Sequence, residues 1–258
     1  MAEDLSRSPQ TIARGFGAVA DEYDRGRPGY APEAIARLVA ELELGPGVPV
    51  LDLGAGTGKL TAMLAPSGAV PVAVEPDPRM RALLERSLPG VTALEGAAEA
   101  IPLDDGAVQA AVVASAFHWF DSGRALRELH RVLSEGGRLA LLWNPADDPP
   151  SPWWDDVYRE IRRTTDTHSH ARREWAETLT RDGLFGGVRE WWFPWQAQMT
   201  LDRVLDRVLS ISYVAALDPP QRAELLERVR AALEGRADEG HTYRMRYRTR
   251  LIVCRRGP

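Results

Sequence analysis

The sequence predicts an α/β protein built around a doubly wound, mostly parallel β-sheet. Between residues 50 and 143, five short apolar segments alternate with segments in which apolar residues recur at helical spacing. The fourth apolar segment, 108–114, is almost continuous, as expected for a central parallel strand covered by helices on both faces. A glycine-rich turn joins the first strand to the helix that follows it. The chain of 258 residues is long enough for one large domain with insertions.

Two further strands complete a predicted sheet of seven. The expected strands cover 50–53, 70–74, 91–94, 108–114, 138–143, 188–195 and 241–256. The expected helices cover 16–23, 32–44, the segment after residue 59, 77–88, 121–133, 153–164, 171–182, 201–217 and 219–234. In the last strand, Tyr243, Met245 and Tyr247 alternate with arginines, which indicates a half-buried strand with the arginines facing outward.

The turn after the first strand reads Asp52-Leu53-Gly54-Ala55-Gly56-Thr57-Gly58. A strand, a glycine turn and a helix direct backbone N–H groups at a ligand beyond the end of the strand, and glycine lets that ligand approach closely. A dinucleotide fingerprint requires its third glycine where Lys59 stands, and a P-loop requires Ser or Thr where Leu60 stands. Neither pattern fits. The segment instead resembles the first motif of class I S-adenosylmethionine (SAM) dependent methyltransferases.

This resemblance implies a Rossmann-like methyltransferase fold and assigns the turn to SAM. The implied cofactor-binding residues of the turn are Asp52, Gly54, Ala55, Gly56, Thr57 and Gly58. Glu75 ends the second strand 21 residues after Gly54, where a carboxylate accepts hydrogen bonds from a ribose diol. Glu75 and Pro76 belong to a segment that resembles the second motif of the family.

Two more segments resemble cofactor-binding parts of the family. Ala97, Ala98 and Glu99 follow the third strand in a loop like the one that holds adenine, with Ala97 where an acidic residue is usual. Tyr23-Asp24-x-x-Arg27-Pro28-x-Tyr30 resembles the N-terminal cap of the type 11 group of small-molecule methyltransferases. The resemblance implies that Tyr23 and Arg27 contact the amino-acid end of SAM and that Arg27 pairs with its carboxylate. A surface arginine in a turn is the alternative.

The fourth strand delivers Ser115, His118, Trp119 and Phe120 to its carboxyl end, where open α/β sheets place their sites. Ser115 is expected to contact SAM, and related small-molecule methyltransferases carry a similar His-Trp-Phe segment. His118 is the candidate catalytic residue, as a general base or a donor to the substrate, because its intrinsic pKa is close to neutral. The alternative is a histidine that only packs or orients the loop.

These patterns predict transfer of a methyl group from SAM to a small-molecule acceptor. Residues 1–45 would form an N-terminal helical cap, 46–144 the SAM-binding core, and 145–258 a substrate-side half with a helical lid at about 200–236, all within a single domain. A nucleic-acid methyltransferase would need a basic groove, whereas the net charge is −5 and the pI is near 5.6. A SAM-binding regulator without catalytic activity remains a further alternative.

Other site classes lack support in the sequence. Asp166, His168 and His170 have a spacing that suits metal ligands poorly, so we expect a solvated loop and no metal. Cys254 is the only cysteine, which excludes an internal disulfide. No apolar run reaches ~18 residues and the N-terminus is polar, so we expect no membrane span and a soluble, cytoplasmic protein. The oligomeric state is left open.

Overall fold

The computed structural model describes residues 16–145, 151–165 and 175–258, and the described part contains the predicted seven-stranded sheet. The strands are β1 (Pro49–Leu53), β2 (Val70–Val74), β3 (Thr92–Leu94), β4 (Val108–Ala114), β5 (Leu133–Trp143), β6 (Phe185–Met199) and β7 (Tyr243–Arg256). Their order across the sheet is β3-β2-β1-β4-β5-β7-β6. β7 runs antiparallel to both neighbours and the other pairs are parallel. The predicted fold class is therefore confirmed.

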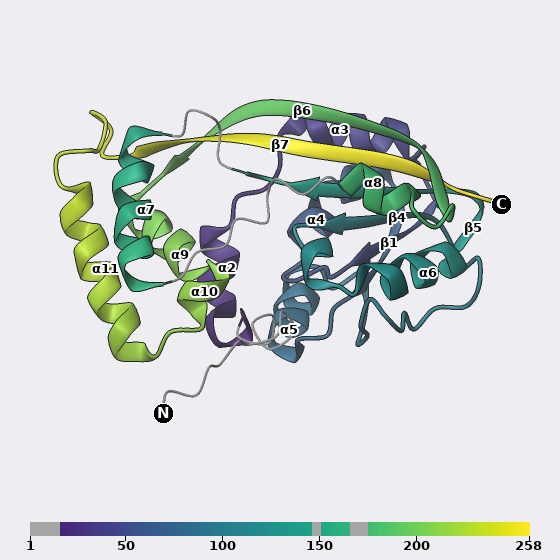
Figure 1. The fold of residues 1–258 in the computed structure, drawn as a ribbon, viewed down its shortest axis with the longest axis horizontal. Helices are drawn as coiled ribbons and strands as arrows, with labels where there is room; N and C mark the ends of the chain where they lie inside the picture. The colour runs from purple at the N-terminus through teal and green to yellow at the C-terminus, as the bar shows by residue number, and fades with distance from the viewer. Residues whose placement is uncertain (1–15, 146–150, 166–174) are drawn as a thin grey trace.

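Helices surround the sheet and cover one end of it (Figure 1). The helices of the N-terminal half are η1 (Phe16–Val19), α2 (Ala20–Gly26), α3 (Pro32–Glu41), α4 (Lys59–Leu64), η2 (Ala65–Ser67), α5 (Pro78–Ser87), η3 (Phe117–Trp119) and α6 (Ser122–Val132). The later helices are α7 (Pro152–Thr164), α8 (Trp175–Thr180), α9 (Leu201–Leu209), α10 (Ser212–Ala215) and α11 (Pro219–Leu233). As predicted, Asp77 caps α5: its side chain accepts from the backbone N–H groups of Arg79 and Met80.

Separate apolar clusters pack on the sheet and beyond it. One is centred on Phe117, Leu129 and Leu141, and another on Leu38, Leu64 and Leu142. Alternation along β5 sends Leu141 and Leu142 into different clusters, so both faces of the sheet are covered.

β6 and β7, with 15 and 14 residues, are the longest of the seven strands and pair from Phe185–Arg256 to Met199–Tyr243. Their far ends leave the parallel sheet as a two-stranded ribbon, on which α7, α9, α10 and α11 form a second lobe (Figure 1). This helical lobe has its own core, which includes Trp153, Val157 and Leu225. The N-terminal helix α2 packs against α9, so the predicted cap and the predicted lid are in contact.

Several predicted boundaries were wrong. The helix predicted over 201–217 breaks into α9 and α10, because Ile211 adopts an extended backbone conformation between them. Strand β6 extends to Met199 rather than residue 195, and β5 begins at Leu133 with an irregular pairing to β4. The predicted outward orientation fails for Arg250, which is 5% exposed because its guanidinium forms two 3.0 Å hydrogen bonds with Glu190.

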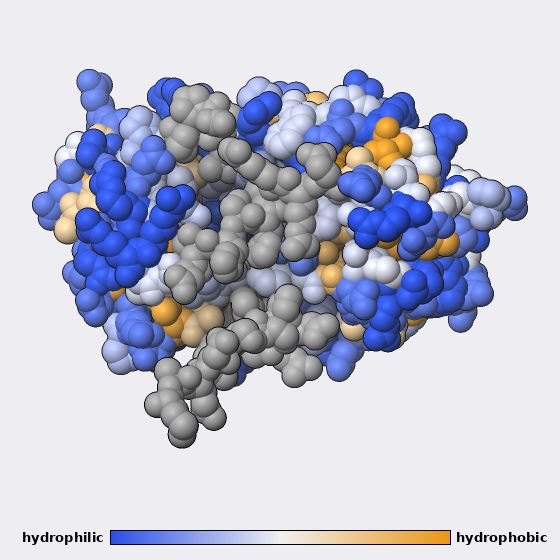
Figure 2. All heavy atoms as spheres, in the orientation of Figure 1, coloured by the Kyte–Doolittle hydropathy of each residue, from blue (hydrophilic) through white to orange (hydrophobic). Residues whose placement is uncertain are grey.

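The face shown in Figure 2 is mainly hydrophilic, with apolar residues in small patches. No helix in the described ranges combines the length and the apolar character needed to cross a bilayer.

Candidate functional site

The carboxyl ends of β1, β2, β4 and β5 lie at one edge of the sheet, on the side of the helical lobe (Figure 1). β1 and β4 are neighbours in the sheet. From β1 the strand order runs outward through β2 and β3 on one side, and from β4 it runs outward through β5 on the other, so the strand order reverses between β1 and β4. A crevice forms at such a point in doubly wound sheets. Two adjoining cavities of about 520 Å³ and about 50 Å³ open there. Both are lined by Tyr23, Gly54, Gly56, Ala114 and Ser115.

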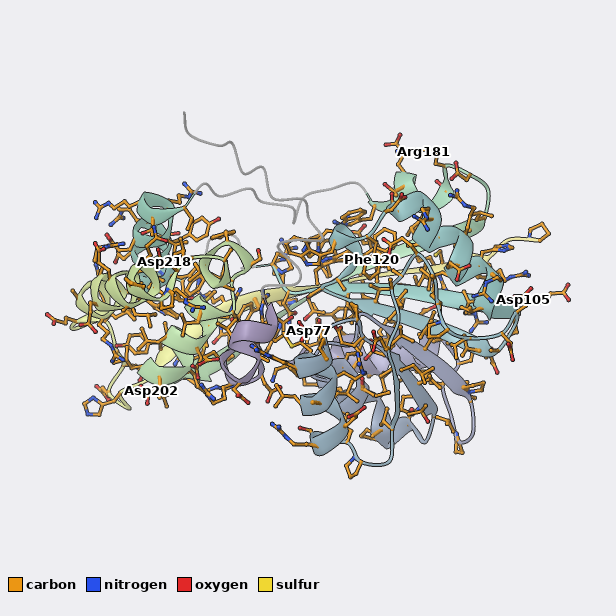
Figure 3. The ribbon with its side chains drawn as sticks, turned by 90° about the horizontal axis from the view of Figure 1, so that it is seen from below. Asp77, Asp105, Phe120, Arg181, Asp202 and Asp218 are labelled. Carbon is orange, nitrogen blue, oxygen red and sulfur yellow. The ribbon has the colours of Figure 1, made fainter. Side chains whose placement is uncertain are left out.

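The larger cavity runs from the glycine turn toward the third strand. Its other lining residues are Leu53, Glu75, Pro76, Asp77, Pro78, Met80, Glu95, Gly96, Ala97, Ala98, Glu99, Ala116, Trp119 and Phe120. Asp77 and Phe120, which both line it, lie near the junction of the sheet and the helical lobe in Figure 3. A cavity of this size matches a ligand of nucleoside dimensions.

The glycine turn is shaped by different constraints at each glycine. A Cβ on Gly54 would lie 2.8 Å from the Ala116 Cβ atom, so packing inside the protein requires that glycine. Gly56 has a φ of 58°, and a Cβ there would meet no atom within 4 Å because it would project into open space. Gly56 is therefore the point where a ligand can approach the backbone. Gly58 instead packs on Leu84 and lines neither cavity.

Most backbone N–H groups of the turn are engaged within the protein. Gly54 and Ala55 donate to the Val74 carbonyl oxygen, and Gly58 donates to that of Ala55. The Gly56 N–H donates to Glu75 Oε2 at 2.9 Å. The sequence-based expectation that these donors point at a ligand is wrong for these four residues, because the donors stabilise the turn. Ala55 and Thr57 line the smaller cavity.

Glu75 lies between the turn and the start of α5. Its second carboxylate oxygen, Oε1, accepts the Asp77 N–H at 2.9 Å. Glu75 is 8% exposed, and burial raises the pKa of its carboxyl to about 7 against the opposing effect of the Asp77 and Gly56 donors. Each carboxylate oxygen has two lone pairs, so both can accept a second hydrogen bond from a ligand diol in the cavity.

Asp52 lies beneath the turn and lines neither cavity. It is completely buried; its Oδ2 accepts the Thr61 hydroxyl at 2.6 Å, and its Oδ1 has no partner among the described residues. Burial raises the pKa of this carboxyl to about 6. In the structure, Asp52 therefore links β1 to α4 through its hydrogen bond with Thr61.

The loop predicted to hold adenine lines the far end of the larger cavity. Ala97 and Ala98 contribute small apolar side chains, and Pro76 faces the same space. Glu99 Oε1 accepts the backbone N–H of Asp121 at 2.8 Å, which joins this loop to the start of α6. The predicted residues of the second and third motifs thus share one cavity with the glycine turn.

Ser115 occupies the junction between the two cavities. Its φ of 54° is left-handed and uncommon for a residue other than glycine. Its backbone N–H donates to Leu142 in β5, and its hydroxyl lies 3.1 Å from the Tyr30 hydroxyl. Strained backbone at a strand end is typical of ligand sites.

The N-terminal segment covers the smaller cavity and is held there by the turn. Asp24 accepts the Thr57 hydroxyl at 2.7 Å and lies 3.4 Å from the Lys59 ammonium group. Tyr23 and Arg27 both line the smaller cavity, and the Arg27 guanidinium lies over the Tyr23 ring. Arg27 Nη2 also donates to the Ser210 carbonyl oxygen at 2.9 Å.

His118 lies in η3 and is not among the residues that line these two cavities. Its Nδ1 is 3.4 Å from the indole N–H donor of Trp143, and its ring packs on Trp119. The neighbouring Trp119 and Phe120 do line the larger cavity. The catalytic role of His118 remains a prediction. The three candidate metal ligands, Asp166, His168 and His170, lie outside the described residues.

Several cavity residues were not predicted as site residues from the sequence. Tyr30, Asn144, Arg207 and Tyr247 line the smaller cavity from four separate elements or loops. Asn144 follows β5 directly, so the rule that sites lie at strand ends could have found it. No sequence pattern marks Arg207 and Tyr247 as site residues, because their position beside the cavity depends on how the helical lobe packs against the rest of the protein.

Comparisons with known proteins identify the family of this chain. A profile of a methyltransferase domain matches residues 51–141. An uncharacterized methyltransferase of Mycobacterium tuberculosis is 39% identical over 229 residues, which cover 89% of each chain. The demethylmenaquinone methyltransferase of Thermus thermophilus is 42% identical over 118 residues, 43% of this chain and 52% of that protein.

A solved structure shares the fold as well. A protein from Anaeromyxobacter dehalogenans assigned as a type II methyltransferase aligns with a TM-score of 0.59 and 25% identity, covering 90% of this chain and 97% of the other. The sheet order, the glycine turn and the extent of the mycobacterial match agree. The chain belongs to the class I SAM-dependent methyltransferases.

Proposed function

We propose that this protein transfers the methyl group of SAM to a small-molecule acceptor. The proposal rests on the position of Glu75, which lines the larger cavity and whose two oxygens are already fixed by Gly56 and Asp77. A fixed, partly satisfied carboxylate suits a ribose diol, and the apolar Ala97 and Ala98 at the far end suit a base. Arg27, with a buried Nε that has no partner among the described residues, suits the carboxylate of SAM.

The protein's own part in the reaction would be positioning. Bound SAM supplies a methyl group on a sulfonium, which is already electrophilic. Ser115 and Gly54, which border both cavities, would mark the region where the acceptor approaches. The helical lobe and α2 cover this region and would exclude water, so that orientation and desolvation provide most of the acceleration.

A small acceptor is favoured over a polynucleotide. The smaller cavity is roofed by residues of α2, α9 and β7, which leaves room for a compact ligand and not for a strand. The relative from Thermus thermophilus bears the name of an enzyme that methylates a quinone, a small molecule. The acidic net charge of −5 also gives a polyanion no general attraction.

Calorimetry with SAM, S-adenosylhomocysteine and NAD tests the cofactor. We expect one site per chain for the first two ligands and none for NAD, and Gly56→Val should abolish binding because its side chain would enter the cavity. Binding of NAD without SAM would overturn the proposal.

Incubation with methyl-labelled SAM and a size-fractionated cell extract tests the acceptor. Label should pass to the low-molecular-weight fraction, and transfer should survive EDTA. Label in the nucleic-acid fraction would overturn the small-molecule acceptor. SAM binding without transfer to any fraction would support a regulator.

A further inference from the structure

The smaller cavity is surrounded by buried hydrogen-bond donors without partners. Arg27 Nε, Arg207 Nε and the Tyr247 hydroxyl are buried and make no hydrogen bond with any described residue, and all three residues line this cavity. Tyr247 as a whole is only 1% exposed. A buried donor without a partner costs about 1–3 kcal/mol, so three around one cavity indicate a ligand that accepts hydrogen bonds.

The charge of the residues that line the smaller cavity indicates which kind of hydrogen-bond-accepting group would bind there. The guanidinium-bearing residues Arg27 and Arg207 line the same cavity, and burial together with the charge of Arg207 lowers the pKa of Arg27. The nearby carboxylates are engaged elsewhere: Asp24 with Thr57 and Lys59, and Asp206 with Arg25 at 2.8 Å. The ligand group is therefore an anion, and a planar carboxylate matches the guanidinium fork.

The volume indicates an anchoring group rather than a complete ligand. About 50 Å³ has room for about three to five waters at 10–15 Å³ each, and so for small anionic groups. The donors come from different parts of the chain. Arg27 directly follows α2, near Tyr23 and the glycine turn, whereas Arg207 is on α9 and Tyr247 on β7, both in the substrate-side half.

We propose that the acceptor is a carboxylic acid and that Arg207 and the Tyr247 hydroxyl bind its carboxylate, leaving Arg27 for the carboxylate of SAM. This inference rests on the proposed function. Arg207 is held for this role by Ser210, whose hydroxyl lies 3.4 Å from its Nη1, and by Trp154, whose ring its guanidinium covers at 5.6 Å. Tyr247 is held by stacking on Trp195 at 5.1 Å.

The test uses linear monocarboxylic acids from acetate to decanoate, with their primary amides, titrated into the complex with S-adenosylhomocysteine. We expect acids to bind and the matching amides to bind at least about tenfold more weakly, since the amide lacks the charge. Arg207→Gln should weaken acid binding by about tenfold or more while changing the affinity for S-adenosylhomocysteine less than about twofold. Tyr247→Phe should weaken acid binding alone and keep the ring stack.

Arg203→Gln is the matched control, because Arg203 is an exposed arginine one turn earlier on α9. If Arg207→Gln does not fold, Arg207→Lys takes its place. The lysine keeps the positive charge but lacks the paired N–H donors of the guanidinium, so Arg207→Lys should also lower the affinity for acids. Equal binding of acids and amides, or no binding of any acid, would overturn the proposal, as would an equal loss of affinity for acid and S-adenosylhomocysteine in the Arg207 variants. Failure of S-adenosylhomocysteine to bind the wild type would overturn the proposed function itself, and this proposal with it.

Discussion

The backbone N–H of Gly56 donates a 2.9 Å hydrogen bond to Glu75 Oε2, which joins the glycine turn to the end of the second strand. The bond fixes one oxygen of Glu75, and the Asp77 N–H fixes the other. The carboxylate is thereby oriented before any ligand arrives. Preorganisation of this kind reduces the ordering cost of binding.

Glu75→Gln should therefore weaken SAM binding by about 1–3 kcal/mol, because the amide nitrogen would face the Gly56 or Asp77 N–H and one acceptor would be lost. Calorimetry with SAM measures the loss. Glu85→Gln is the control, since Glu85 is an exposed residue of the adjacent helix α5. Unchanged affinity in Glu75→Gln would show that this carboxylate does not bind the ribose.

The raised pKa values of Glu75 and Asp52, about 7 and about 6, predict how stability without ligand depends on pH. Both values exceed those of the unfolded chain, so between pH 4.5 and 7 the folded protein holds protons that the unfolded chain has released. The free energy of unfolding should fall as pH rises through this range, by roughly 1.4 kcal/mol per pH unit for each group within its own window.

Urea unfolding at pH 5, 6, 7 and 8 measures this dependence. Glu75→Gln should flatten the slope between pH 5 and 7, whatever its effect on the stability at any one pH. An unchanged slope in that variant would contradict the raised pKa of Glu75.

Much of the sheet could be predicted because its signals are local. The apolar run of β4 and the capping by Asp77 depend on neighbours in sequence, and both were confirmed. Part of the larger cavity could also be predicted, since strand ends converge by topology: Gly56, Glu75 and Ala97 all line it.

The smaller cavity could not be predicted, because its walls depend on tertiary packing. Arg207 lies on a helix whose amphipathic pattern looks like any other, and β7 shows the same alternation for Tyr247 as for Tyr243. Only the contact of α2 with α9 brings Arg207 beside Arg27. The burial of Arg250 could not be predicted for the same reason. Its partner Glu190 is 60 residues away in the sequence, and the alternation along the strand by itself predicts an exposed arginine.

Gly26 sets the distance between α2 and α9. A Cβ at this position would lie 2.3 Å from the Asp206 carbonyl carbon and 2.4 Å from the Arg207 nitrogen. Gly26→Ala gains about 1 kcal/mol of helix propensity but costs about 1–3 kcal/mol or more through overpacking against backbone atoms. The variant should be less stable in urea unfolding and bind SAM more weakly, because Arg27 would move.

Gly45→Ala is the control for this experiment, since a Cβ there would meet no atom within 4 Å and the residue has no positive φ. It should leave both stability and affinity within the error of measurement. A Gly26→Ala protein as stable as the wild type would mean that α2 and α9 can separate without loss.

For His118 the sequence leaves a catalytic and an orienting role open, and its contacts in the structure favour the orienting one. A general base must accept a proton on a free ring nitrogen. Here the Trp143 indole N–H points at Nδ1 at 3.4 Å, and in a neutral imidazole this places the proton on Nε2. Neither nitrogen is then a free acceptor, so we expect His118 to orient the loop that carries Trp119 and Phe120.

Steady-state kinetics of His118→Gln and His118→Ala, beside SAM affinity and thermal unfolding, separate the two roles. For an orienting residue, His118→Gln should keep kcat within about tenfold of the wild type, because the glutamine oxygen can still accept from Trp143, whereas His118→Ala should lower the Tm and SAM affinity together. For a general base, both variants should lose about 10²-fold or more in kcat while SAM affinity stays unchanged. A large loss of kcat in His118→Gln at unchanged affinity and Tm would therefore restore the catalytic role predicted from the sequence.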